Sequence, residues 1–254
     1  MRHGTAVATL TSIAALLTGG GAITVGTGVL GPDGQGGTRL PRGSEPVTLN
    51  PADFLTRVTN PYWPMARGSR WIYRETDAEG ANRRVRITVT GNEKRILGIP
   101  VTVVRDIVSE DGALVEATWD WYAQDTVGNV WYMGEDTAAY DAGKVVSRLG
   151  SWEAGVDGAQ PGIVIPGRPK VGQRYRQEYY AGKAEDQGMV LSLDAKATVP
   201  FGSYTRLLRT RDTTPLEPSL VENKYYAKGV GPILARDISG GTGREELVRF
   251  RRPR

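Results

Sequence analysis

Four short segments of this 254-residue chain occur twice, in the same order and 104 to 106 residues apart. Self-similarity at a fixed period predicts a duplicated structural unit. The alternative is that β-rich chains reuse similar glycine turns and aromatic strands without duplication. The matched pairs are residues 64–71 with 169–175, 98–106 with 202–212, 114–116 with 220–222, and 121–123 with 225–227.

Residues 114–136 are typical of a β-hairpin. From Trp119 to Gln124 the side chains alternate in type, the period of two that places neighbours on opposite faces of a sheet. Residues 125–129 supply a turn in which Gly128 can adopt a positive φ, and residues 130–133 resume a β-branched and aromatic strand. Three of the six Trp lie in this hairpin, so it predicts either an aromatic core or a stacking surface for a ligand.

Strand and turn patterns of this kind continue through both repeats. We therefore expect an all-β fold: an antiparallel curled sheet, half-barrel or barrel built from a duplicated meander. A short N-terminal helix is expected at 50–58, with Asn50 as N-cap and Pro51 in its first turn. The predicted domain spans 50–254, with repeats at about 64–140 and 169–238. Its strands are expected at 70–75, 84–90, 101–108, 116–123, 130–134, 174–180, 189–199, 203–211, 221–227, 232–238 and 245–250.

The first 31 residues have the pattern of an export signal. Arg2 and His3 precede an uncharged run whose apolar centre, residues 6–17, has the length of a signal-peptide core. Gly and other small residues follow, which favours a cleaved signal peptide; the alternative is an N-terminal anchor. Residues 32–49 are rich in Gly and polar side chains and are predicted to be a disordered linker. The predicted location is therefore extracellular or in the cell envelope.

The chain contains no Cys, and its only His is His3. These absences exclude Ser-His-Asp and Cys-His catalytic sites. They also exclude zinc or iron sites built on imidazole or thiolate ligands. Any enzymatic activity would have to use carboxylates, Lys, Tyr, Ser, Arg, backbone groups or an oxygen-bound metal.

Acidic residues are concentrated in the middle of the chain. Residues 106–160 contain eleven Asp or Glu and two Lys or Arg, whereas the flanking segments are basic. Hard oxygen ligands suit Ca²⁺, although here they lack EF-hand spacing and can instead stabilise a turn. Asp120 and Glu135 on adjacent strands also form a candidate carboxylate pair for glycoside hydrolysis, although exposed carboxylates on neighbouring strands are common. The candidate calcium ligands are Asp120, Asp125, Asn129, Glu135 and Asp136.

Aromatic side chains are the candidate ligand-binding residues. A curled sheet with aromatics on its concave face can hold an apolar or saccharide ligand, whereas the alternative is that the same rings form the core. The doublets 131–132 and 179–180 must place one ring on each face of a strand. The candidates are Trp119, Trp121, Tyr122, Trp131, Tyr132, Tyr179 and Tyr180.

Several motifs together resemble a family of uncharacterised exported bacterial proteins and lipoproteins of actinobacterial type. The resemblance extends from about residue 60 to 237 and implies export and a β-rich fold, with no activity and no catalytic residues. Many relatives have a lipobox Cys, which this chain lacks. The motifs are NPYWP at 60–64, GSRWIY at 68–73, DWYAQDTVGNVWY at 120–132, GSWEAG at 150–155 and YYAKGVG at 225–231.

We therefore expect an exported cell-envelope protein that is a non-enzymatic binding module with an aromatic-lined cleft. The alternatives are a calcium-dependent hydrolase that uses carboxylates of the acidic block and a purely structural envelope protein. No nucleic-acid partner is expected. The basic residues 249–254 form either a solvated tail or a peripheral contact with an anionic envelope.

Overall fold

The computed structural model describes residues 40–253. The predicted signal peptide or anchor, residues 1–31, and the first part of the predicted linker, residues 32–39, lie outside the described residues.

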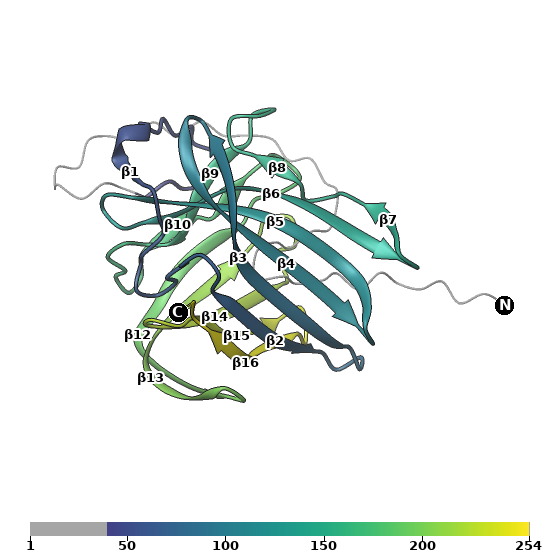
Figure 1. Cartoon of the computed structure of the whole chain (residues 1–254). Helices are drawn as coiled ribbons and strands as arrows, with labels where there is room; N and C mark the ends of the chain where they lie inside the picture. Colours follow the sequence, from purple (N-terminus) through teal and green to yellow (C-terminus); the bar gives the residue numbers. More distant parts are fainter. Residues whose placement is uncertain (1–39, 254) are drawn as a thin grey trace.

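The described chain forms one antiparallel sheet that curls into a nearly closed barrel (Figure 1). Thirteen strands follow one another along the sheet in the order β10-β12-β13-β14-β15-β16-β2-β3-β4-β5-β6-β9-β11. The two ends of this path, β10 and β11, are separated in the chain by Gln177 alone. The sheet must therefore curl to bring its two edges together, and the predicted all-β fold is confirmed.

Most strands agree with the predicted ranges to within a few residues, whereas the predicted strand 174–180 is broken into β10 and β11. The strands are β1 (Phe54–Leu55), β2 (Arg70–Thr76), β3 (Asn82–Ile96), β4 (Ile99–Glu110), β5 (Ala113–Asp125), β6 (Val130–Asp141), β7 (Lys144–Ser147), β8 (Trp152–Glu153), β9 (Gln160–Ile165), β10 (Arg174–Arg176), β11 (Glu178–Tyr179), β12 (Gln187–Val199), β13 (Gly202–Thr213), β14 (Val221–Ala227), β15 (Gly231–Ser239) and β16 (Arg244–Arg251).

The hairpin predicted at 114–136 is formed by β5 and β6. Asp120 pairs with Glu135, and the register shifts by one residue at Trp121 and Tyr122. The extra residue is Met133 of β6. Beside it, Gly134 has φ 129°, and a Cβ there would overlap the backbone of Trp152 in β8. Only glycine combines this backbone conformation with so close an approach.

Long hairpins recur in the two halves of the chain. The β3–β4 hairpin is followed by β5–β6, and the β12–β13 hairpin is followed by β14–β15. The β3–β4 turn uses Gly98, which has φ 78°, whereas the β12–β13 hairpin turns at residues 200–201. This succession follows the predicted repeats, although a common origin stays a prediction.

The expected N-terminal helix is reduced to a single 3₁₀ turn, Pro51–Asp53. Asn50 caps it as predicted, because its side chain accepts a hydrogen bond from the Ala52 amide at 3.2 Å. The helix does not continue to residue 58, because Phe54 adopts an extended conformation and β1 pairs with the end of β5. Among the described residues no helix is long and apolar enough to span a membrane.

Residues 40–49, the second part of the predicted linker, lie against the barrel. The buried guanidinium of Arg176 donates hydrogen bonds to the carbonyls of Gly43 and Glu45, each at 2.7 Å. The Arg176 amide also donates to the carbonyl of Pro41 at 2.7 Å. These bonds give this part of the linker a defined course beside β10.

Aromatic rings fill one end of the barrel interior. The Trp63 ring lies 5.1 Å from Tyr122 of β5 and 6.4 Å from Tyr226 of β14. These two strands are six places apart along the sheet, so their inward-facing rings meet across the interior. The side chain of Trp63 therefore acts as a core residue that joins opposite walls.

Candidate functional site

A large group of acidic side chains is buried in the barrel interior. Alternation along the strands directs most of them inward, and they interact between strands. For example, the charge of Asp106 in β4 helps to raise the pKa of Glu245 in β16. Two cations balance part of its charge. The ammonium of Lys224 lies 3.0 Å from Asp212 and 3.2 Å from Glu222, and the guanidinium of Arg83 lies 2.9 Å from Glu75. The buried acidic side chains are Glu75, Asp106, Asp120, Glu135, Glu178, Asp186, Asp212, Glu222 and Glu245.

Burial raises the pKa values of most of these carboxyl groups, because a charged carboxylate loses its hydration there. The pKa of Asp120 rises to about 7, chiefly through burial and further through the charge of Glu116. Burial likewise raises the pKa of Glu222 to about 7, partly offset by Lys224. For Glu135, burial followed by the charge of Glu178 places the pKa well above its ordinary value. Burial therefore favours the protonated form of these interior carboxyl groups.

Some interior oxygen atoms have clear donors and others have none. The Tyr132 hydroxyl donates to Asp120 at 2.8 Å, and the Trp152 indole donates to Glu178 at 2.8 Å. Within residues 40–253, no hydrogen-bond partner lies at Glu135 Oε1 or at either carboxyl oxygen of Glu245. Protonation lowers the cost of burying such oxygens, which agrees with the raised pKa values.

The Asp120 and Glu135 pair, the candidate for glycoside hydrolysis, is brought together on adjacent strands as predicted. Their side chains are only 2% and 3% exposed. A polymeric substrate therefore cannot reach them in this conformation, and the pair serves the interior of the barrel.

The remaining candidate metal ligands lie elsewhere. Asp125 holds the β5–β6 turn, because its carboxylate accepts the Asn129 amide at 2.8 Å, the Asn129 side chain at 2.7 Å and the Trp131 indole at 2.9 Å. Asp136 lies at the surface and pairs with Arg148 at 2.9 Å. Across the described part of the chain, no three acidic or His side chains form a group suited to a metal ion. The calcium assignment stays a prediction.

The candidate aromatic residues divide between the two faces of the barrel wall. Tyr122 and Tyr132 point inward, with ring centroids 5.0 Å apart, and Trp152 meets Tyr132 edge-on at 5.4 Å. Trp119 and Trp121 point outward and lie beneath the cationic groups of neighbouring strands. The inward rings of Tyr122 and Tyr132 belong to the core, and the separation of the two rings of each doublet onto opposite faces stays a prediction.

Tyr179 and Tyr180 lie at the end of β11 and just after it, and β11 is joined to the hairpin through β9. Both are partly buried, and the Lys183 amine donates to the Tyr180 hydroxyl at 2.8 Å. The seven candidate aromatic residues therefore do not line one common cleft.

A groove of about 410 Å³ lies between residues 40–54 and the β5–β6 turn. Trp131 reaches it, with its ring edge-on to Phe54 at a centroid distance of 6.1 Å. Trp131 was predictable from the sequence, whereas this wall was not, because residues 40–49 have the composition of a linker. Their Pro and aliphatic residues are the only local signal for the wall. The lining residues are Leu40, Pro41, Glu45, Pro46, Val47, Thr48, Leu49, Asn50, Asp53, Phe54, Asp125, Thr126, Val127, Asn129 and Trp131.

Comparisons with known proteins concern the fold. No protein-family model matches the sequence, and no curated protein matches it. A presumed exported protein with a YmcC-like fold from Bacteroides fragilis matches with a TM-score of 0.45 and 11% identity, over 75% of this chain and 98% of its own. A presumed lipoprotein from Parabacteroides distasonis matches with a TM-score of 0.40 and 9% identity, over 75% of this chain and 98% of its own.

Proposed function

We propose that this chain is an exported, non-enzymatic binding protein of the cell envelope, and that the groove beside the β5–β6 turn holds an apolar or saccharide ligand. The observation that carries the proposal is the groove itself, which joins Phe54 and Trp131 to aliphatic side chains of residues 40–49. The signal-like segment at residues 6–17 supports export.

The groove has the size and composition of a small-molecule site. Its volume of about 410 Å³ lies in the range of about 300–1,000 Å³ that is usual for ligand pockets. The Trp131 ring is held in place by its hydrogen bond to Asp125. Thr48, Asp53 and Thr126 add polar groups at the groove, which could bind ligand hydroxyls.

Two substitutions of similar chemistry test the groove. Val127 lines it and is 50% exposed, whereas Val145 in β7 lies outside it and is 45% exposed. Val127→Arg places a long charged side chain in the groove, and Val145→Arg is the matched control. Neither position belongs to the core, so both variants should fold.

The exported protein would be titrated with the neutral apolar dye N-phenyl-1-naphthylamine, by fluorescence, and with cellotriose, by saturation-transfer NMR. We expect one of the two probes to bind the parent protein and Val145→Arg, and to bind Val127→Arg at least about tenfold more weakly. Binding that survives equally in both variants, or no binding of either probe, would refute the groove as the site.

A further inference from the structure

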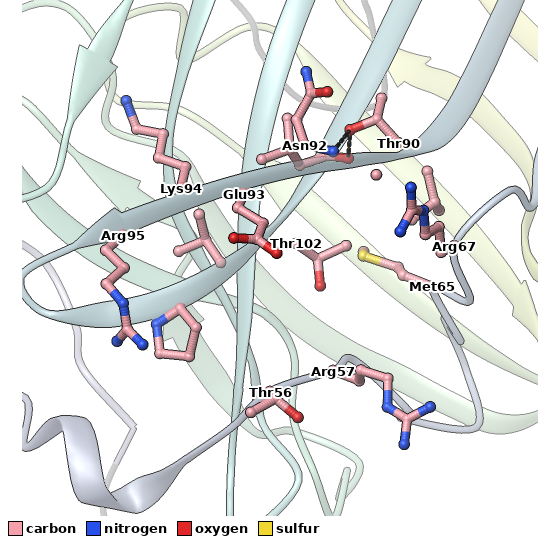
Figure 2. Close-up of a pocket in the computed structure, with 15 residues that line it drawn as sticks. Thr56, Arg57, Met65, Arg67, Thr90, Asn92, Glu93, Lys94, Arg95 and Thr102 are labelled. Atoms are coloured by element: carbon pink, nitrogen blue, oxygen red, sulfur yellow. Dashed lines mark hydrogen bonds between the residues drawn. The ribbon is translucent and has the colours of Figure 1, made fainter.

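A second groove is lined in part by Thr56 and Arg57, which follow β1. It has a volume of about 600 Å³ and is enclosed by the β3–β4 hairpin and by residues 56–67 (Figure 2). Met65, Val89, Val101 and Val103 give it an apolar surface, and side chains of Thr and Asn add polar groups. This groove shares no lining residue with the groove of the proposed function.

Cationic side chains dominate the charge of this groove. Arg57, Arg67, Lys94 and Arg95 line it against a single carboxylate, Glu93. In Figure 2, Arg57 and Arg67 are seen on one side of the groove, Arg95 on the other and Glu93 between them.

Two of the four cations are already engaged. Lys94 forms a 2.8 Å ion pair with Glu153 and lies 3.7 Å from the centroid of the Trp121 ring. A guanidinium nitrogen of Arg95 donates to the carbonyl of Gly98 at 2.8 Å. By contrast, within residues 40–253, neither Arg57 nor Arg67 has a hydrogen bond or ion pair from its guanidinium.

The position of Arg67 depends on a glycine in the middle of a strand. A Cβ at Gly91 of β3 would overlap the Arg67 guanidinium, so the planar group lies directly against the Gly91 backbone. Gly91 does not have a positive φ, and glycine weakens a strand interior. Gly91 lies within the register shift between Val89 and Glu93, and its lack of a Cβ leaves room for the Arg67 guanidinium at the groove.

We propose that this second groove binds a saccharide that carries a carboxylate or a phosphate. Guanidinium groups bind both oxyanions through paired hydrogen bonds. Arg57 and Arg67 supply such groups, and Thr56 and Thr102 supply hydroxyls for the sugar. The largely buried Met65 and its apolar neighbours form the floor of the groove. Glu93 opposes anions and limits the affinity.

The test uses two arginine pairs of equal charge. Arg57→Gln/Arg67→Gln removes both available guanidiniums, whereas Arg84→Gln/Arg86→Gln removes two exposed arginines of β3 that do not line the groove. The parent and both variants would be titrated with glucose 6-phosphate, glucuronate and glucose by isothermal calorimetry, with thermal melting as the check on folding.

We expect at least one of the two anionic sugars to bind. Binding of glucose 6-phosphate would identify phosphate as the recognised group, and binding of glucuronate would identify carboxylate. The groove variant should bind it about tenfold or more weakly than the parent, whereas the control pair should leave the affinity unchanged. Gly91→Ala should weaken binding by displacing Arg67, and Glu93→Gln should strengthen it. Equal losses in both arginine pairs, equal binding of glucose, or no binding of either anion would overturn the proposal.

Discussion

Replacing Asp120 with Asn should change how the stability of the barrel depends on pH. Asp120 is buried opposite Glu135, and its pKa of about 7 compares with 3.8 for an exposed Asp. Burial is the main cause and Glu116 adds to it, whereas the Tyr132 hydrogen bond and Arg105 act in the opposite direction.

The sign and size of the effect follow from proton linkage. The folded protein holds the Asp120 proton more tightly than the unfolded chain, so its stabilising contribution is complete below about pH 4 and is lost as pH rises through about 7. The difference between 3.8 and about 7 corresponds to about 4 kcal/mol. Asn cannot ionise, and its carbonyl oxygen can still accept the Tyr132 hydrogen bond.

The assay is urea unfolding followed by Trp fluorescence between pH 4 and 8.5. Asp120→Asn and the parent should have similar stability near pH 4, and at pH 8.5 the variant should be the more stable, by up to about 4 kcal/mol. Asp136→Asn is the control, because this exposed residue only pairs with Arg148 at the surface, and we expect it to leave the pH dependence unchanged. The reasoning would be contradicted if the stability of the parent did not fall above pH 5, or if the stability of Asp120→Asn fell by the same amount.

Three further substitutions test the interior, each by chemical denaturation. Tyr132→Ala should cost about 3–5 kcal/mol, because a fully buried ring is removed; a loss below about 1 kcal/mol would show that this ring is not part of the core. Gly134→Ala should sharply reduce stability and the yield of folded protein, since its Cβ meets the Trp152 backbone, and normal stability would show that β8 moves freely. Lys224→Met should lower the stability by about 3–5 kcal/mol at pH 8, because Asp212 and Glu222 lose their counter-charge. The loss of stability should be smaller near pH 4, where carboxyl groups are protonated. A loss that does not depend on pH would contradict this explanation.

Local pattern was sufficient to predict most of the long strands and the central hairpin, but it missed β7, β8 and β9 between residues 144 and 165. Alternation from Trp119 to Gln124 and the turn residues 125–129 located β5, β6 and the pairing of Asp120 with Glu135. Both are short-range properties, because the pleat repeats every two residues and the turn is stabilised by Asp125. The helix expected at 50–58 failed because β1 gains tertiary pairing with β5, which a local capping signal cannot reveal.

The candidate site was only partly predictable. Trp131 and Asp125 were identified from the sequence, yet their groove has a second wall of residues 40–54, which is far away in the chain. The position of that wall depends on Arg176, whose guanidinium binds carbonyls more than a hundred residues earlier. No local pattern carries that contact.

The sequence by itself determined most of the long strands, the central turn and the absence of Cys-based sites. Tertiary structure alone decided which face of each strand points inward, because the aromatic strands β5 and β6 carry rings on both faces. Closure of the barrel placed Tyr132 in the core and left Trp119 on the outer face. The same closure buried Asp120 and Glu135, because curling the sheet removes water from one face of every strand at once. From the sequence, these two residues were candidates for an accessible site.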